Sequence, residues 1–111
     1  MWQRAHGLAL VVYRSTNGFP HAERFALTNQ IRRAPVSLVA DIAAGCGRFT
    51  AAERARFFDM AGGSICELEA LILIARDLDY LDSRTGATLL AEIAEVRRML
   101  VALTARIRRR A

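Results

Sequence analysis

Apolar side chains recur at helical spacing along four stretches of the chain. In the first stretch, about Trp2–Ser15, they follow an i, i+3, i+4, i+7 pattern at Ala5, Leu8, Ala9 and Val12. Trp2 and Tyr13 extend this apolar face at its two ends, so the pattern predicts a helix with one buried side. Gly18 and Pro20 then end the helix, because glycine suits a helix C-terminus and proline disfavours helical conformation in the residue before it.

A second helix is predicted over about His21–Ala44. Its core stripe is nearly unbroken and consists of Leu27, Ile31, Ala34, Leu38, Ile42 and Gly45. A second stripe beside it consists of Phe25, Thr28, Arg32, Pro35 and Val39. Inside a helix, a proline removes an amide donor and collides with a carbonyl group of the preceding turn, at a cost of about 3 kcal/mol. Because the core stripe keeps its phase on both sides, we expect a kink at Pro35 and not a break.

A third helix is predicted over about Ala51–Asp79, and it carries two apolar stripes. One stripe consists of Phe58, Ala61, Ile65, Leu68, Ile72 and Ala75. The other consists of Phe57, Met60, Ser64, Leu71, Ile74 and Leu78. A helix that is apolar around much of its girth is buried on several sides. In so small a domain, a second copy of the chain is the best cover for the surplus apolar surface.

The surplus stripe of the third helix therefore predicts an oligomer interface. Its candidate residues are Phe57, Met60, Gly62, Gly63, Leu71 and Ile74. The two adjacent glycines cost the helix about 1 kcal/mol each relative to alanine. In return they permit a neighbouring backbone to approach closely.

A fourth helix is predicted from Asp82 or Ser83, either of which can cap it, to about Arg109. Its apolar residues form a heptad seam typical of helix bundles, at Leu89, Ile93, Val96, Leu100, Leu103 and Ile107.

The connection between the second and third helices has the residues of a helix hairpin. Gly45 and Gly47 are expected to end the second helix in the left-handed conformation. Thr50 and Glu53 have the spacing of a capping box, in which each side chain bonds to the amide of the other residue. A phosphate-binding glycine loop is not indicated, because no strand precedes these glycines and no Gly-Lys-Ser/Thr sequence follows them.

Together the four helices predict a single all-α domain over residues 1–111, a four-helix bundle with long second, third and fourth helices. No apolar run approaches the ~20 residues of a membrane span, and no signal peptide is indicated. We therefore expect a cytoplasmic protein in which Cys46 and Cys66 are buried or half-buried free thiols.

Charge is distributed unevenly along the chain. All 16 positive side chains are arginines, against 11 carboxylates, for a net charge of +5. The last helix holds the candidate nucleic-acid-binding residues Arg97, Arg98, Arg106, Arg108, Arg109 and Arg110, with no acidic residue among them. Removing these six charges from the net +5 leaves −1 for the remainder. The alternative is a solvated helix end whose cations match the helix dipole. No aromatic residue lies within this tail, so we expect recognition of phosphates and shape, without base stacking.

No catalytic site, metal or cofactor is predicted. The only histidines, His6 and His21, lack the glutamate three residues earlier that di-iron bundles need, and neither shares a face with Ser64 or Cys66. The acidic residues Glu53, Asp59, Glu67 and Glu69 are instead expected to pair with arginines of neighbouring helices, such as Arg33, Arg48 and Arg54. The predicted polar network that locks the bundle consists of Arg33, Asp41, Arg48, Glu53, Ser64 and Glu67.

An ordered series of motifs carries a family resemblance. The segments QIRRAPVSLVADIAAGCGRFTAAERARFF, GSICELE and RRML resemble the bacterial four-helix-bundle family encoded in intervening sequences of large-subunit ribosomal RNA genes. The resemblance implies an up-down-up-down bundle, a cytosolic homopentamer and no established enzymatic activity. A related branch contains basic pentameric accessory proteins of diversity-generating retroelements, which work with nucleic acid. The family tends to have Asn at the position of Asp41 and Glu at that of Ala44, so no polar site built on that pair carries over.

Two functions stay open at this stage. One is binding of structured RNA or DNA, for which five copies would bring together about +30 of formal charge if their arginine-rich ends converge. The other is a protein-interaction scaffold with incidental basicity. The sequence does not identify a small-molecule ligand.

Overall fold

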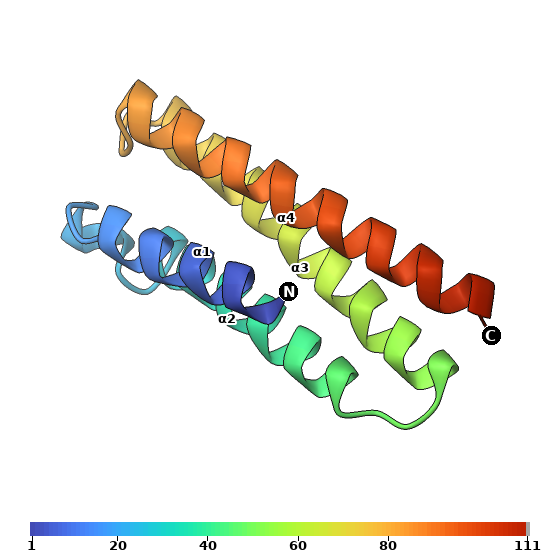
Figure 1. Ribbon diagram of the computed structural model, residues 1–111. Helices are drawn as coiled ribbons and strands as arrows, with labels where there is room; N and C mark the ends of the chain where they lie inside the picture. The colour runs from blue at the N-terminus through green and yellow to red at the C-terminus, as the bar shows by residue number, and fades with distance from the viewer. Residues whose placement is uncertain (111) are drawn as a thin grey trace.

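The computed structural model describes residues 1–110 of the chain, which form four α-helices and one short 3₁₀ turn (Figure 1). Helix α1 spans Trp2–Ser15, α2 spans Leu27–Cys46, α3 spans Ala51–Asp77 and α4 spans Ser83–Arg110, while the turn η1 spans His21–Glu23. No strand occurs within the described range. The predicted all-α fold is therefore confirmed.

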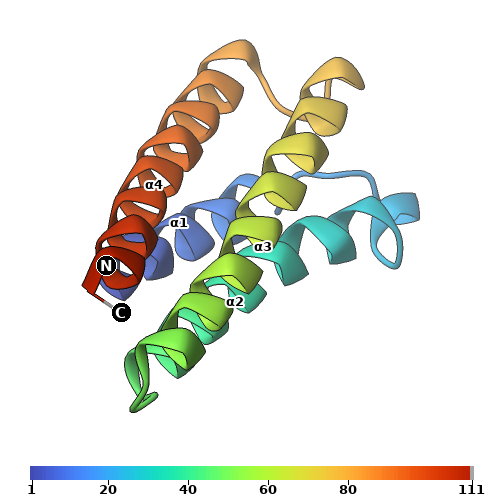
Figure 2. The same cartoon turned by 90° about the vertical axis from the view of Figure 1, so that its right-hand side faces the viewer.

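Consecutive helices run in opposite directions, as Figures 1 and 2 show. Within residues 1–110, α1 and α3 each pack against both α2 and α4, and the diagonal pairs α1–α3 and α2–α4 lie apart. This arrangement confirms the up-down-up-down topology. The molecule is elongated, with principal extents of 46 × 24 × 19 Å.

Helix α1 is much shorter than the bundle that it joins. It has 14 residues against 28 in α4, so it is about 21 Å long beside a helix of about 42 Å. The N-terminus consequently lies near the middle of the bundle, and beyond it α2, α3 and α4 continue without a fourth partner (Figure 1). One half of the molecule is thus a four-helix bundle, and the other half has three helices.

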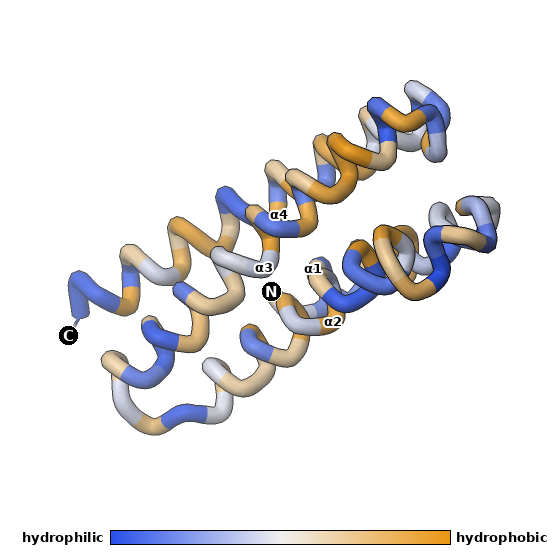
Figure 3. Tube along the Cα trace, turned by 180° about the vertical axis from the view of Figure 1, so that it is seen from behind, coloured by the Kyte–Doolittle hydropathy of each residue, from blue (hydrophilic) through white to orange (hydrophobic). Residues whose placement is uncertain are grey.

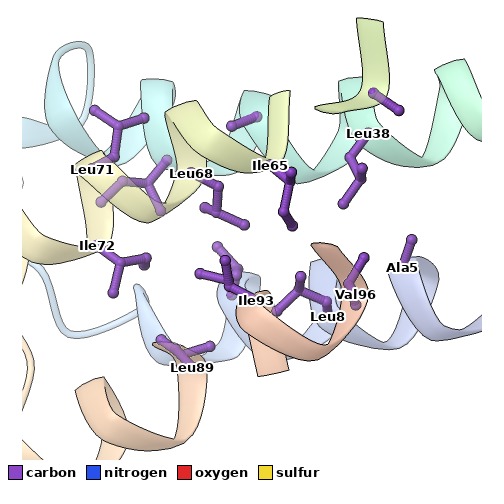
Figure 4. Packing of buried hydrophobic residues seen from close by; sticks show 14 of the residues in the cluster. Ala5, Leu8, Leu38, Ile65, Leu68, Leu71, Ile72, Leu89, Ile93 and Val96 are labelled. Atoms are coloured by element: carbon purple, nitrogen blue, oxygen red, sulfur yellow. The ribbon is translucent and has the colours of Figure 1, made fainter. Parts of the chain in front are cut away.

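The core is built from the predicted apolar stripes (Figure 4). The first stripe of α3 is buried along its whole length, and the heptad seam of α4 is buried from Leu89 to Leu100. Each of the four helices contributes side chains that are at most 2% exposed, among them Leu8, Leu38, Ile42, Ile65, Ile72, Ile93 and Val96. The prediction of the core is confirmed, because helical periodicity alone determines which side of each helix is apolar.

The second helix begins later than predicted. Residues 21–23 form η1, and Ala26, with φ −121° and ψ −106°, departs from helical geometry before α2 begins at Leu27. Phe25 is therefore 82% exposed and does not join the second stripe of α2. The helix continues without a break through Pro35, whose side chain is buried.

The prediction that Trp2 and Tyr13 extend the buried face of α1 is also wrong. Trp2 is 45% exposed and Tyr13 is 44% exposed. The buried face of α1 is confined to Ala5, Leu8 and Val12, which meet the core directly.

The glycines that follow α2 do not adopt the predicted left-handed conformation. Gly47 has φ −87°, and every glycine in the described part of the chain has negative φ. Gly45 instead permits close packing, because a Cβ atom there would lie 2.7 Å from Cε1 of Phe58 and 3.1 Å from Cβ of Phe57. Among residues 1–110, Asp79 is the residue with a left-handed backbone, at φ 62°, and α3 ends before it at Asp77.

The helix N-termini are capped largely as predicted. The amide of Glu53 donates to Oγ1 of Thr50 at 3.1 Å, which is one half of the expected capping box. The return bond from the Glu53 carboxylate is not formed within the described residues. Asp82 caps α4, because its Oδ1 accepts from the amide of Thr85 at 2.7 Å and its Oδ2 accepts from the hydroxyl of Thr85 at 3.1 Å. These bonds lower the pKa of the Asp82 carboxyl.

Candidate nucleic-acid interface

One end of the bundle gathers most of the free positive charge. Since α3 and α4 are antiparallel, the start of α3 and the preceding α2–α3 turn lie beside the C-terminal end of α4 (Figure 1). We call residues 47–59 and 103–110 the basic end. It holds two carboxylates, Glu53 and Asp59, and seven arginines, Arg48, Arg54, Arg56, Arg106, Arg108, Arg109 and Arg110. The rest of the chain has nine arginines and nine carboxylates, so the net +5 belongs to this end.

The hydropathy of the trace shows the same concentration. In Figure 3 the tip of α4 at the C-terminal end is hydrophilic, whereas the turns before it and the middle of the bundle alternate between apolar and polar positions. Arg106, Arg109 and Arg110 are exposed, and within residues 1–110 none of the three forms an ion pair.

The other three predicted arginines of α4 are paired inside the chain. Arg97 Nη2 lies 2.9 Å from Oε1 of Glu69 on α3, and this hydrogen bond raises the pKa of Arg97. Arg98 pairs with Glu95 on its own helix, and Arg108 pairs with Asp59 on α3. No carboxylate follows Arg97 in the sequence, but Glu95 in the preceding turn of α4 and two residues of α3 supply the acidic partners of these three arginines.

Three arginines of the basic end were not among the nucleic-acid-binding residues predicted from the sequence. Arg48, Arg54 and Arg56 lie near the start of α3, where antiparallel packing brings them beside the end of α4. Arg54 Nη1 donates to the carbonyl oxygens of Arg48 and Phe49 at 3.3 and 3.1 Å, so it fixes the backbone of the turn. The predicted capping box located the start of this helix. Combined with an antiparallel topology, it would have placed these arginines beside the end of α4.

A pocket of about 420 Å³ opens in the basic end. Its lining includes Arg54, Arg106 and Arg110 together with the apolar side chains of Phe58, Leu103 and Ile107. The pocket lies between the end of α2, the start of α3 and the end of α4, in the half of the bundle that α1 does not reach.

An aromatic side chain stands at the same end. Phe49, in the α2–α3 turn, is 96% exposed. The guanidinium group of its neighbour Arg48 lies over the ring of Phe57, 4.5 Å from the ring centroid. The end of α4 contains no aromatic residue. The fold places Phe49 at the same end of the bundle, although it lies about sixty residues earlier in the sequence.

The predicted polar network is not formed. Among the described residues, no hydrogen bond between side chains and no ion pair joins any two of Arg33, Asp41, Arg48, Glu53, Ser64 and Glu67. Arg33, Glu53 and Glu67 lie on outward faces of their helices. Asp41 is half-buried, and this burial raises the pKa of its carboxyl.

Ion pairs between helices do occur, but they use other arginines. Asp59 pairs with Arg108 of α4, and Glu69 pairs with Arg97 of the same helix. The predicted partners were Arg33, Arg48 and Arg54. Arg4 of α1 holds Glu92 of α4 at 2.6 Å. For Asp59 and Glu69, the prediction of an ion pair with a neighbouring helix was correct, but the predicted arginine partners were wrong.

The predicted oligomer interface divides into buried and exposed parts. Leu71 is 8% exposed and belongs to the core, as Figure 4 shows, and Phe57 is half-buried beneath Arg48. Met60 and Ile74 are 48% and 47% exposed. A Cβ atom at Gly62 or Gly63 would meet nothing within 4 Å, so these glycines serve no close packing inside the subunit.

Other chemistry is sparse in the described part of the chain. Both cysteines, Cys46 and Cys66, are free as predicted but exposed, contrary to the expected burial. Among residues 1–110, no three His, Cys, Asp or Glu side chains lie close enough together to hold a metal ion. Within the same range, none of the helices combines the length and the apolar character that crossing a bilayer would require.

The topology and core define an antiparallel four-helix-bundle protein whose charge is concentrated at one end. Residues 1–102 match the family described as 23S rRNA-intervening sequence protein, and the chain belongs to that family. The family resemblance noted in the sequence is thereby confirmed.

A solved structure has the same fold. The crystal structure of a protein with unknown function from the S23 ribosomal protein family of Bacteroides thetaiotaomicron VPI-5482 is similar to this chain with a TM-score of 0.83. The likeness covers 93% of this chain and 96% of that one, at 15% sequence identity, so it concerns the fold alone. No curated protein matches the sequence.

Proposed function

We propose that the chain is a non-enzymatic cytoplasmic protein that assembles into a homopentamer and binds structured RNA or DNA through its basic ends. The observation that carries this proposal is the placement of seven arginines and only two carboxylates at one end of the bundle. Arg108 is neutralised by Asp59, which leaves Arg48, Arg54, Arg56, Arg106, Arg109 and Arg110 available for phosphates.

Assembly supports the proposal by multiplying this charge. Affinity for a polyanion rises with the number of phosphates that a protein neutralises, since each contact releases counterions. One basic end offers a few contacts, and five on a common face offer several times as many. The pentamer is what the family resemblance implies. The exposed apolar strip of Met60 and Ile74, with the open surface at Gly62 and Gly63, supports contact between copies on α3.

A salt titration with charge variants tests the binding function. The full chain is titrated with a structured RNA hairpin at several salt concentrations, and the triple variant Arg106→Ala/Arg109→Ala/Arg110→Ala is measured in parallel. The matched control is Arg14→Ala/Arg33→Ala/Arg84→Ala, which removes the same charge from exposed arginines outside the basic end.

We expect the basic-end variant to bind at least tenfold more weakly at low salt and to show a shallower dependence of log affinity on log salt, because each lost phosphate contact reduces the slope by about one. The control variant should stay close to the wild type. Salt-insensitive binding, or an equal loss in both variants, would contradict the proposed function.

A further inference from the structure

Phe49 is the most exposed large apolar residue in the described part of the chain. Its side chain is 96% exposed, although a phenylalanine in a soluble domain is usually at least partly buried. The backbone beneath it is nonetheless well fixed. Arg54 donates to the carbonyl oxygen of Phe49 at 3.1 Å, and the next residue, Thr50, caps α3. The turn therefore presents an aromatic ring to the surroundings from a fixed position.

The arginine that fixes the turn also lines the pocket of the basic end. Arg54 lies there with Arg106 and Arg110, over a lining that includes Phe58, Leu103 and Ile107. The volume of about 420 Å³ lies within the range of small-ligand sites, about 300–1,000 Å³. Three guanidinium groups lining a largely apolar pocket favour an anionic occupant.

We propose that the basic end holds an unpaired nucleotide of a nucleic acid, with the base stacked on Phe49 and the neighbouring phosphates bound by Arg54, Arg106 and Arg110. This inference rests on the proposed function and narrows it: the preferred sites on RNA or DNA are loops and single-stranded ends. Stacking of unpaired bases on aromatic side chains and phosphate binding by arginine are the two standard components of single-strand recognition.

Other polyanionic partners fit the surface less well. A membrane surface is bound by several apolar side chains on one face, and Phe49 is the one large apolar side chain exposed in the basic end. An acidic protein segment would engage the arginines and leave the aromatic ring without a function. A nucleotide uses both groups, because every base has a flat face next to a charged phosphate.

The test compares two RNA probes that differ only in unpaired bases. One is a blunt duplex, and the other is the same duplex with a single-stranded uridine overhang at its 3′ end. The full chain and the variant Phe49→Ala are titrated with both probes at several salt concentrations. The chain offers a matched control in Phe25→Ala, since Phe25 is 82% exposed but lies near η1, outside the basic end.

We expect the wild type to bind the overhang probe about tenfold more tightly than the blunt duplex. Phe49→Ala should lose this preference while it keeps the affinity for the blunt duplex and its salt dependence. Phe25→Ala should behave like the wild type. Thermal unfolding should be nearly unchanged in both variants, because both rings are largely exposed.

A spectroscopic variant reports on stacking directly. In a Trp2→Phe background, Phe49→Trp should retain the preference for the overhang probe. Its fluorescence should be quenched by the overhang probe and not by the blunt duplex.

Each contrary outcome has a distinct meaning. Equal, salt-dependent binding of both probes by the wild type, or an unchanged preference in Phe49→Ala, overturns this inference and leaves the proposed function standing. Absence of binding to either probe at low salt overturns both. Binding of anionic phosphatidylserine vesicles that requires Phe49, without a preference for the overhang, identifies a membrane surface and also overturns the inference.

Discussion

Gly45 shows how a single residue sets the distance between two helices. The ring of Phe58 occupies the space that a side chain at this position would need, since its Cε1 atom lies 2.7 Å from where a Cβ atom would stand. Phe58 is 2% exposed and cannot move aside without disturbing the core. The requirement for glycine at Gly45 is therefore one of packing, and the turn that follows forms with ordinary negative φ angles.

We expect Gly45→Ala to lower the free energy of unfolding by up to about 2 kcal/mol. Overpacking a core contact costs about 1–3 kcal/mol, and the better helix propensity of alanine offsets about 1 kcal/mol of this. The control is Gly7→Ala on α1, where a Cβ atom meets nothing within 4 Å and the same propensity gain should stabilise the protein. Urea unfolding at one protein concentration measures both variants, and equal stabilisation of the two would refute the packing requirement.

At the scale of elements, α1 is attached to the bundle by an arginine of α2. Arg32 Nε donates to Oγ1 of Thr16 at 2.8 Å, and its Nη2 donates to the carbonyl oxygen of Tyr13 at 3.2 Å and to Oδ1 of Asn17 at 3.1 Å. The guanidinium group also lies 4.9 Å from the ring centroid of Tyr13. These contacts satisfy groups at the C-terminus of α1 that no further helical turn can reach.

We expect Arg32→Ala to destabilise the protein by about 1–2 kcal/mol, since each hydrogen bond contributes about 0.5–1.5 kcal/mol and the loss leaves Thr16, only 2% exposed, with fewer partners. Amide exchange should quicken mainly in α1. Arg33→Ala, which removes an exposed neighbour, is the control and should leave exchange in α1 unchanged. A uniform increase of exchange over all four helices would argue against a local clamp.

The elements themselves were largely predictable, because periodicity and caps are local properties of the sequence. The stripe from Phe58 to Ala75 and the seam from Leu89 to Leu100 were identified from spacing alone. The start of α2 was not, since Pro20 is compatible both with a helix and with the 3₁₀ turn that is found. The ion pairs between helices could not be predicted from the apolar pattern. Arg108 and Asp59 are 49 residues apart, and their contact depends on how α3 and α4 are rotated about their axes.

At the scale of the whole molecule, the basic end is a product of topology. The end of α4 contributes four arginines within residues 106–110, the α2–α3 turn and the start of α3 contribute three more, and antiparallel packing brings the two groups together. Phe49 joins them for the same reason. The distribution of charge along the sequence predicted the arginines on α4. The arginines near the start of α3 join this surface only because the two helix ends lie side by side in the fold.

The proposed pentamer would multiply the positive charge of a single subunit fivefold. We expect the purified wild type to have the mass of a pentamer by light scattering. Met60→Glu/Ile74→Glu should lower that mass, because it places charges on the exposed apolar strip of α3. Val36→Glu, at a 50% exposed position on α2, is the control and should keep the wild-type mass. A monomeric wild type, or dissociation by the control alone, would exclude this interface.

The short first helix gives the two halves of the molecule different mechanical properties. Where α1 braces α2 and α4, backbone opening requires the separation of four packed helices; beyond its N-terminus only three hold together, so local unfolding there costs less free energy. The arginines and Phe49 are carried by this more compliant half. In the proposed assembly, the rigid half would fix the position of a subunit among its neighbours, and the other half would adjust to the irregular contour of a folded polynucleotide.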